Sequence, residues 1–434
     1  MREYWNPEME CMPAGELREL QGRSLRRLVE RLYDFNRFYH DRMRAAGVLP
    51  SDIRSIDDAS RLPFMYKEDL RENYPTKMFT VPNSEIVRFH ASSGTSGKPT
   101  VVGYTKGDLE YWTEALARSL TSIGVGSDDV LQVSYGYGLF TGGLGLHYGA
   151  ERVGASVVPS STGNTERQLE LMQDLDVTTI ACTPSYMMHM NTVAKRMGMD
   201  IRRDTSLRKA ILGAEPWTES MRRHIEESTG VRAYDIYGTS EQAGPMFSEC
   251  AERDGIHVGG DIMMVEILDP ATGERLEDGS EGEMAVTMLK KEAMPMVRFR
   301  VKDVASLMKG ECACGRTSPR LSRITGRTDD MLIIRGINVF PSQIEYALMR
   351  MPEVGDQYMI TVSRDGDLDH MTLQAEIRSE AFSDKVEDMV RIRSRIESEL
   401  KKYLNLAVAV ELKAPGELPR FEGKAKRVID KRVY

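Results

Sequence analysis

The chain has 434 residues, 41% of them hydrophobic and 29% charged, which fits two or three globular units with a sizeable core. Its formal net charge of -8 argues against nucleic acid as the main partner, because phosphate backbones are bound by basic faces. No run of about 18 apolar residues is present. Residues 1–17 also lack a charged-then-apolar signal pattern. We therefore expect no membrane partner and a cytoplasmic location.

The first two thirds of the chain carry helical and strand patterns in alternation. Apolar residues at helical spacing over residues 16–47 predict one long or two short N-terminal helices. Beyond them, two strands at 86–89 and 100–105 flank a polar loop. Helices are then expected near 107–123, 142–152, 164–174, 185–198 and 217–229, and strands at 130–134, 155–159, 177–182, 209–213 and 231–236. This alternation predicts a parallel sheet covered by helices on both faces.

The remaining residues predict two further units. Short strands and turn signals over residues 258–326 favour an antiparallel subdomain. The last hundred residues alternate strands with one long amphipathic helix near 385–404, which predicts a small α+β domain. The fold class expected is therefore α/β, with a large domain over residues 1–328, a small one over 329–434 and a boundary near Asp329.

The polar loop between the two expected strands is the strongest local signal. Its glycines allow the backbone N–H groups to approach an anion, and its hydroxyls and lysine add donors for phosphate oxygens. It is not a Walker loop, because the glycine spacing fails and Pro99 follows the lysine. Taken alone, a flexible polar hairpin explains it equally well. The loop consists of Ser92, Ser93, Gly94, Thr95, Ser96, Gly97 and Lys98.

Five motifs in order resemble those of the adenylate-forming superfamily, which holds acyl-CoA synthetases, peptide-synthetase adenylation domains and luciferase. They are the polar loop, YGTSE (237–241), RFRVKD (298–303), GRTDD (326–330) and Gly423-Lys424. The segments YGYGLFTGGLGLHYGAER (135–152), CACGRTSPR (312–320) and RGINVFPSQIE (335–345) are most similar to the phenylacetate–CoA ligase family. The similarity covers nearly the whole chain.

The resemblance implies a nucleotide site with assigned residues. Thr95, Ser96 and Lys98 of the polar loop would hold the ATP triphosphate. Thr239 would contact the α-phosphate, and Glu241 would hold Mg²⁺, a cation that prefers carboxylate oxygens. Asp303 would bind the ribose. The other ATP- or AMP-binding residues implied are Gly213, Ala214, Glu215, Pro216, Asp235, Tyr237, Gly238 and Arg327.

The resemblance also assigns a mobile lysine, Lys424, with Asp329 as the hinge. A carboxylate attacking the α-phosphorus brings two anions together, and an ammonium group between them stabilises the growing charge. The small domain of the superfamily then rotates and opens a coenzyme A channel. Arg335, Gly336 and Asn338 would lie on that channel. From position alone, a solvated basic tail that includes Lys426 and Arg427 is the usual explanation for Lys424.

An aromatic and glycine-rich segment after the strand at 130–134 is the candidate acid pocket. Ligands of such sheets lie beyond the carboxyl ends of the strands, and aromatic walls suit a flat ring. The alternative is that these side chains only pack the following helix. The residues are Tyr135, Tyr137, Phe140, Gly142 and Gly143.

Three cysteines and a histidine are a candidate metal site. Cys250 and His257 form one half, and Cys312 and Cys314 form the other. Together they would complete a closed tetrahedral structural zinc site. Free thiols without metal are the alternative, and a disulfide framework is not expected in a long cytosolic chain.

The function expected from the resemblance is ATP-dependent ligation of a small aryl acid such as phenylacetate to coenzyme A, releasing AMP and pyrophosphate. ATP, Mg²⁺ and coenzyme A are the expected cofactors, small molecules the expected partners, and a homodimer the family-level expectation. The alternative is an adenylyltransferase that stops at adenylation or loads a carrier protein.

Overall fold

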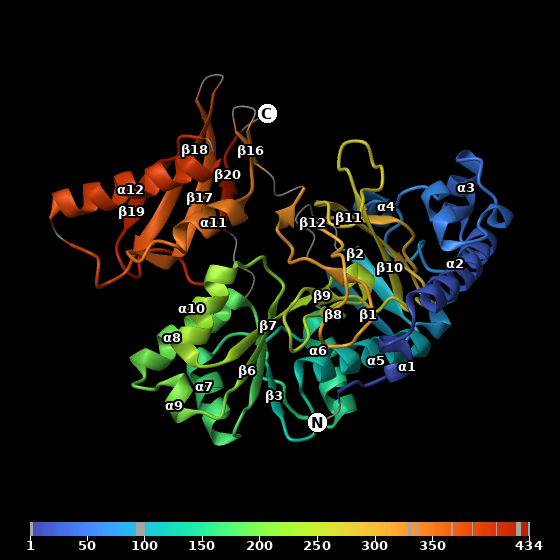
Figure 1. The fold of residues 1–434 in the computed structure, drawn as a ribbon, viewed down its shortest axis with the longest axis horizontal. Coiled ribbons are helices and arrows are strands. Elements are labelled where there is room, and N and C mark those ends of the chain that lie inside the picture. Colours follow the sequence, from blue (N-terminus) through green and yellow to red (C-terminus); the bar gives the residue numbers. More distant parts are fainter. Residues whose placement is uncertain are drawn as a thin grey trace.

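A large sheet organises the first part of the chain (Figure 1). The computed structural model describes residues 3–92, 100–139, 141–328, 332–334, 337–365, 368–383, 385–404, 406–421 and 427–432. The strand order is β13-β9-β8-β7-β6-β5-β3-β4, with β3 to β7 parallel and the other three antiparallel. The parallel strands lie where the sequence predicted them. The bounds are β3 (Val130–Val133), β4 (Ser156–Val158), β5 (Thr179–Cys182), β6 (Lys209–Gly213), β7 (Arg232–Tyr237), β8 (Phe247–Ser248), β9 (Ile256–His257) and β13 (Arg320–Leu321).

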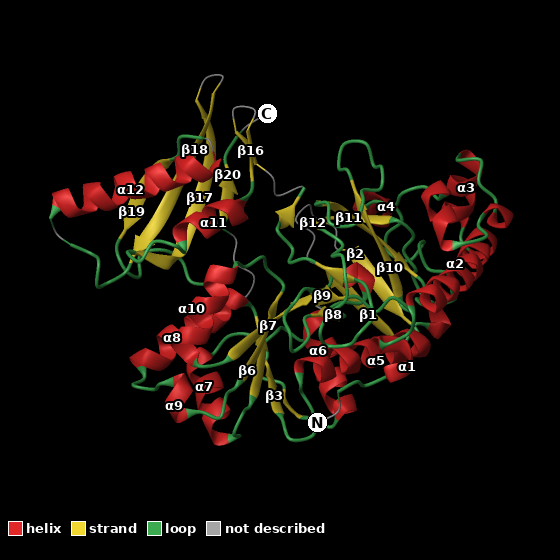
Figure 2. Ribbon diagram, in the orientation of Figure 1, coloured by secondary structure: helices red, strands yellow, loops and turns green. Residues whose placement is uncertain are grey.

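Helices cover both faces of this sheet, and each face has its own apolar core (Figure 2). Trp112, Leu116 and Leu146 belong to the core under α5 and α6, whereas Leu169 and Ile225 belong to the core under α7, α8 and α10. This confirms the predicted α/β layering. The helices are α5 (Lys106–Ile123), α6 (Thr141–Val153), α7 (Thr165–Asp174), α8 (Pro184–Arg196), α9 (Ile201–Asp204) and α10 (Glu219–Thr229).

Local signals set the ends of helix α5. Asp108 N–H donates to Thr105 Oγ1 at 3.0 Å, and Thr105 N–H donates to Asp108 Oδ2 at 3.0 Å, which satisfies two amides at the helix start. The helix ends at Gly124, whose φ of 81° lies in the left-handed region that glycine adopts without strain. The helix therefore runs from Lys106 to Ile123 because both of its ends are capped.

The N-terminal segment and two antiparallel sheets lie beside the large sheet. Two consecutive helices, α2 and α3, replace the alternative of one long N-terminal helix, and the predicted antiparallel subdomain is the sheet β10-β11-β12-β14. The elements are α1 (Pro7–Glu10), α2 (Ala14–Phe35), α3 (Arg37–Ala45), α4 (Lys67–Glu72), β1 (Arg88–Ser92), β2 (Thr100–Tyr104), β10 (Met263–Leu268), β11 (Gly282–Met288), β12 (Phe299–Ala305), β14 (Gly326–Arg327), and the short turns η1 (Pro50–Asp52), η2 (Ile56–Arg61), η3 (Asn83–Glu85) and η4 (Ser240–Gln242).

The C-terminal part has a core of its own, built from residues between Leu332 and Val428. Its sheet has the order β19-β18-β17-β20, and α11 and α12 pack on it. The predicted α+β unit is therefore confirmed. Its elements are β15 (Leu332–Ile334), β16 (Ile337–Val339), α11 (Pro341–Leu348), β17 (Val354–Asp365), β18 (Leu368–Ile377), α12 (Val386–Leu404), β19 (Ala409–Lys413) and β20 (Val428–Asp430).

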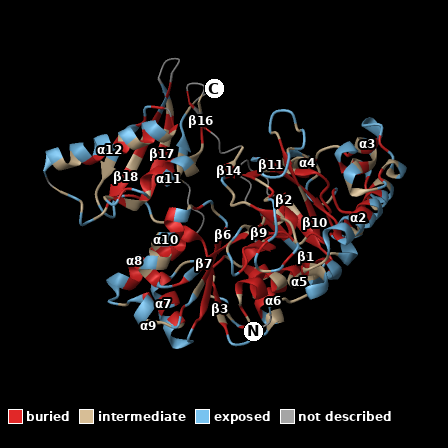
Figure 3. Ribbon diagram, viewed as in Figure 1, coloured by how far each residue is buried: buried red, intermediate tan, exposed pale blue. Residues whose placement is uncertain are grey.

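Burial follows this division, with the central strands of the large sheet buried and the outer faces of α2 and α12 exposed (Figure 3). Among the described residues, no helix combines the length and apolar character that crossing a bilayer requires.

Candidate active site

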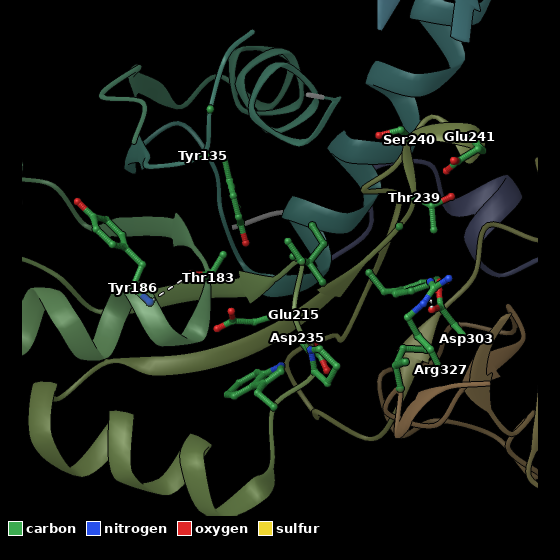
Figure 4. A pocket seen from close by; sticks show the side chains of 18 of the residues that line it. Tyr135, Thr183, Tyr186, Glu215, Asp235, Thr239, Ser240, Glu241, Asp303 and Arg327 are labelled. Atoms are coloured by element: carbon green, nitrogen blue, oxygen red, sulfur yellow. Dashed lines mark hydrogen bonds and ion pairs between the residues drawn. The ribbon is translucent and has the colours of Figure 1, made fainter. Parts of the chain in front are cut away.

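A cavity of about 460 Å³ opens beyond the carboxyl ends of β6 and β7, where parallel sheets bind their ligands. The antiparallel subdomain closes one side of it with Asp303 and Arg327 (Figure 4). Its walls bring together many of the residues that the sequence motifs predicted: Tyr135, Ala214, Glu215, Pro216, Asp235, Tyr237, Gly238, Thr239, Glu241, Asp303 and Arg327.

The turn after β6 forms one wall. A Cβ on Gly213 would lie 2.1 Å from the carbonyl oxygen of Ile236, so only glycine permits this approach of β6 to β7. Ala214 follows with a φ of 68°, which directs the chain across the cavity. Glu215 Oε1 then accepts a hydrogen bond from Ser185 N–H at 2.6 Å, in the first turn of α8. A fixed carboxylate therefore lies on the cavity wall.

Tyr237, Asp303 and Arg327 form a connected group on the opposite wall. The Tyr237 hydroxyl donates to Asp303, and Arg327 Nη1 lies 2.6 Å from Asp303 Oδ1. Burial raises the pKa of Tyr237 above its ordinary range, as does the neighbouring Asp303 carboxylate, so the phenol stays protonated and donates. The Tyr237 ring stacks on Phe247 with centroids 5.9 Å apart. An aromatic face and an oriented carboxylate thus meet the same cavity, an arrangement suited to a base and a ribose.

Glu241 follows Thr239 in the turn η4 and is paired with a cation. Lys67 Nζ lies 3.1 Å from Glu241 Oε1, and Lys291 Nζ donates to Glu241 O at 3.5 Å. Burial lowers the pKa of Lys291 to about 8, although the carboxylates of Asp108 and Glu241 act in the opposite direction. Because Lys67 and Thr239 also line the cavity, the Glu241 carboxylate lies at a place where a hard cation and phosphate oxygens could meet it.

Asp235 lies deeper in the cavity wall, on β7. Burial, together with the negative charge of Glu249, raises the pKa of Asp235 to about 7. Arg323 Nε lies 3.9 Å from Asp235 Oδ2 and partly opposes this rise in the pKa. Burial therefore favours the protonated form of this carboxyl.

The candidate acid pocket is only partly on the cavity. Tyr135 lines it and donates its hydroxyl to Cys182 O at 2.5 Å, and Gly142 lines a smaller adjoining cavity of about 40 Å³. Tyr137 instead turns toward α6, where its hydroxyl lies 3.2 Å from His147 Nδ1. A Cβ on Gly143 would lie 2.7 Å from Gly136 O, whereas Gly136 lines the cavity with nothing within 4 Å of an added Cβ.

Several predicted site residues lie outside the described residues. They are most of the polar loop, one aromatic residue, the hinge, part of the coenzyme A side and the mobile lysine. Ser92 is described only as the last residue of β1 and Asn338 as the middle residue of β16. The residues outside are Ser93, Gly94, Thr95, Ser96, Gly97, Lys98, Phe140, Asp329, Arg335, Gly336 and Lys424.

Some cavity residues were not singled out from the sequence. Lys67 lies in α4, in a proline-rich stretch where no motif marked it. The stretch 181–186 and Trp217 are secondary sequence candidates for the acid pocket, and Thr183, Tyr186 and Trp217 do line the cavity, at the edge where β5, β6 and β7 end. Position after a strand is the signal that finds them. The remaining cavity residues, to which the motifs assign no role, are Ser134, Gly136, Thr162, Ile236, Ser240 and Ile324.

The Cys/His cluster, Cys250, His257, Cys312 and Cys314, lies on the antiparallel side of the large sheet. Its four ligand atoms lie within 4.8 Å of one another, and all but Cys314 are buried. Cys314 Sγ is 3.5 Å from His257 Nε2, while Ser318 Oγ is 3.0 Å from His257 Nδ1 and orients the ring. Three thiols and one imidazole at this spacing fit a tetrahedral zinc ion.

The fold and the cavity define an enzyme of the AMP-binding class. The model of the AMP-binding enzyme family matches residues 42–288, and that of the AMP-binding enzyme C-terminal domain matches residues 336–432. Phenylacetate-coenzyme A ligase of Thermus thermophilus is 46% identical over 99% of both chains, and that of Escherichia coli is 42% identical over 98% of this chain and 97% of its own. The chain belongs to the phenylacetate–coenzyme A ligase family, which confirms the resemblance found in its motifs.

Solved structures add information on the arrangement of the two parts of the chain. A 2-hydroxyisobutyryl-CoA ligase in the postadenylation state matches with a TM-score of 0.94 at 30% identity, over 99% of this chain and 93% of its own. The same ligase in the thioesterification state matches over the same shares with a TM-score of 0.74 at 31% identity. The present arrangement is therefore closer to the postadenylation one.

Proposed function

We propose that this protein is an ATP-dependent acid–coenzyme A ligase acting on phenylacetate or a closely related aryl acid. The observation that carries the proposal is the cavity in which Tyr237, Asp303 and Glu241 converge, in a chain 42–46% identical to phenylacetate-coenzyme A ligases over nearly its whole length. Its reaction has two halves. The acid carboxylate attacks the α-phosphorus and pyrophosphate leaves, and then the coenzyme A thiolate attacks the acyl carbon and AMP leaves.

In the first half, the described residues would bind and orient the nucleotide. Tyr237 would stack on adenine, while Asp303 would accept hydrogen bonds from the ribose hydroxyls, fixed by Arg327. Thr239 would donate to the α-phosphate, and Glu241 would exchange its Lys67 contact for magnesium. Magnesium would neutralise the phosphate charge that develops as pyrophosphate departs. The acid would lie toward Tyr135, which together with Thr183 and Tyr186 forms an aromatic and hydroxyl-bearing wall.

The closing experiment for this proposal is a screen of carboxylic acids with ATP, magnesium and coenzyme A, which reads out AMP and the thioester separately. Phenylacetate and near relatives should give both products in equal amounts. Adenylate release without thioester would instead favour the adenylyltransferase. No acid-dependent AMP with any acid in the screen would overturn the proposal.

Lys424 offers a sharper test with a matched control two residues away in the sequence, Lys426. Lys424→Ala should lower adenylation by at least about 100-fold, since the ammonium would stabilise transition-state charge. It should spare thioester formation from a supplied acyl-adenylate. Lys426→Ala removes the same charge from the same basic segment and should leave both half-reactions near wild type. Equal effects of the two variants would count against the assigned role.

A structural zinc ion at the Cys/His cluster is a second part of the proposal. Elemental analysis should find about one zinc per chain. Cys312→Ser should lower that content, whereas Cys182→Ala, at a buried cysteine of the large-sheet core, should retain it. A protein with no zinc after purification in zinc-supplemented medium would contradict this assignment.

The division of the chain at residues 328 and 329, a homodimeric state and a cytoplasmic location complete the proposal. The separate core of the C-terminal part supports the division. Sedimentation velocity measures the oligomeric state, and a sedimentation coefficient of a 49.0 kDa monomer would exclude the dimer.

A further inference from the structure

A buried lysine beside the turn η4 has no part in the mechanism above. Lys291, in the loop between β11 and β12, is 1% exposed. Its Nζ donates to the main-chain oxygen of Glu241 at 3.5 Å and lies 4.4 Å from the centroid of the Tyr104 ring. The ammonium group therefore contacts both an aromatic face and the backbone of a turn that carries two site residues.

The turn is too narrow to be held by side chains of its own glycines. A Cβ on Gly238 would lie 2.6 Å from Gly244 Cα, so neither position has room for a side chain. The turn is closed by Gln242 N–H and Gly244 N–H, which both donate to Thr239 O, at 3.1 and 2.8 Å. Thr239 and Glu241 leave this turn and line the cavity (Figure 4). Their placement therefore depends on what holds the backbone of the turn.

Two side chains that contact each other hold adjacent carbonyl groups of the turn. The Tyr104 hydroxyl donates to Ser240 O at 3.4 Å. Lys291 donates to Glu241 O, the next carbonyl along the chain. Tyr104 is itself fixed, because its ring stacks on Trp112 with centroids 5.5 Å apart in the core under α5. The turn is thus attached at two consecutive residues to the packed core of the large domain.

The backbone next to Lys291 is anchored to the start of α5. The buried carboxylate of Asp108 accepts hydrogen bonds from Glu292 N–H at 2.6 Å and from Ala293 N–H at 2.9 Å. Thr105 Oγ1 also donates to Glu292 Oε2 at 2.6 Å. The chain that carries Lys291 is therefore fixed, which gives the side chain a defined reach to the turn.

The charge of Lys291 requires an explanation other than packing. Removing an ammonium group from water is costly, and a methionine of similar length would fill the same space without that cost. Burial lowers the pKa of Lys291, while the nearby carboxylates of Asp108 and Glu241 raise it. What the ammonium adds is an attraction for a carbonyl dipole, which an apolar side chain lacks.

We propose that Lys291 is a positioning residue of the adenylation half-reaction. Together with Tyr104, it holds the backbone of η4 so that Thr239 meets the α-phosphate and Glu241 meets magnesium. Lys67 contacts the Glu241 carboxylate, which magnesium would take over, whereas Lys291 contacts the main-chain oxygen and stays in place. The inference rests on the proposed function for the roles of Thr239 and Glu241, but the attachment of the turn is independent of which acid is used.

The test compares Lys291→Met with the wild type in acid-dependent ATP–pyrophosphate exchange. The KM for magnesium–ATP should rise roughly tenfold, because the turn loses a hydrogen bond from a charged donor. The KM for phenylacetate should stay within about twofold of wild type, since the turn faces the phosphates and not the aryl group. A general loss of structure would instead raise both KM values together.

Lys290 supplies the matched control. It directly precedes Lys291, but its Nζ pairs with Asp261 Oδ2 at 2.8 Å, and Asp261 keeps a second partner in Arg118 at 2.8 Å. Lys290→Met removes the same charge from the same loop without touching η4, so both KM values should stay within about twofold of wild type. A Lys291→Met variant that behaves like Lys290→Met, or that raises both KM values equally, would overturn the proposal.

A second variant keeps the proposal testable if Lys291→Met does not fold. Tyr104→Phe retains the ring that Lys291 contacts and removes only the hydroxyl that holds Ser240 O. The KM for magnesium–ATP should rise about threefold, a usual size for a neutral hydrogen bond, with the KM for phenylacetate unchanged. No rise in the KM for magnesium–ATP would overturn the attachment of the turn.

Hydrogen–deuterium exchange separates this inference from the proposed function. Lys291→Met, but not Lys290→Met, should speed deuterium uptake at the amides of Gln242 and Gly244, whose hydrogen bonds close the turn. This difference is measured without turnover, so it would stand even if the wild type activated no acid. Unchanged uptake in the substrate-free protein would overturn the role of Lys291 whatever the activity.

Discussion

The nucleotide cavity and the Cys/His cluster lie on one sheet and use buried polar groups in opposite ways. Around the cavity, Asp303 and Glu241 are paired with Arg327 and Lys67 but still face open space. In the cluster, the four ligand atoms face one another within 4.8 Å. The parallel half of the sheet thus presents groups to a ligand that comes and goes. The antiparallel half gathers groups that leave no place for a substrate.

The largest expected effect is the loss of stability caused by a substitution in the Cys/His cluster. Cys250→Ser should remove a ligand of the proposed zinc ion and cost on the order of 5 kcal/mol, because metal binding energy is folding energy. Thermal unfolding should then begin roughly 10 °C lower in a chain of this size. The KM for ATP, measured below that temperature, should stay unchanged. A changed KM with an unchanged Tm would break the contrast.

A substitution in the cavity should instead lower the activity with ATP and leave the thermal stability almost unchanged. Asp303→Asn keeps the shape of the side chain but removes its charge, so hydrogen bonds to Tyr237, Arg327 and a ribose weaken. Loss of about 2 kcal/mol for a charged hydrogen bond corresponds to a roughly 30-fold lower kcat/KM for ATP. The Tm should shift by no more than a few degrees. Initial rates at varied ATP measure the first effect and calorimetry the second.

A smaller effect is expected from pH at Asp235, between the two regions. Its pKa is raised from 3.8 to about 7, so the stability it contributes is fully present below pH 3.8 and is lost as pH rises through 7. Asp235→Asn removes this dependence. The stability of the variant relative to wild type should therefore rise steadily between pH 4 and pH 7. A difference in Tm that does not grow with pH would show that Asp235 is charged throughout.

The smallest effect is expected far from both regions. Arg18 and Asp57 pair at 2.7 Å, but their side chains are 54% and 67% exposed. Arg18→Ala should change the free energy of unfolding by less than about 0.5 kcal/mol, since water screens such pairs. Urea unfolding measures this change in the free energy of unfolding. A larger change would show that the ion pair on the surface of the N-terminal helices stabilises the fold more than its exposure to water predicts.

Sequence patterns predicted the fold because the relevant signals are local. Alternating apolar runs and helical spacing place β3 to β7, and residue types alone marked Cys250 and Cys314 as partners across 64 residues. The sequence did not predict contacts made by residues that belong to no motif. Lys67 meets Glu241 only because α4 packs beside the antiparallel sheet, and Tyr137 turns from the cavity because its hydroxyl meets His147 on α6. These side-chain contacts depend on tertiary packing that composition and periodicity do not encode.

Gly136, in the cavity wall, and Gly143, which packs against its carbonyl oxygen, differ in a way that has a practical consequence. Position 143 has no room, since a methyl group there would collide with the backbone at 2.7 Å. Position 136 faces empty space in the cavity wall. Protein engineers can therefore narrow the chamber from residue 136 in steps of one carbon and shift preference toward smaller acids while the sheet stays intact.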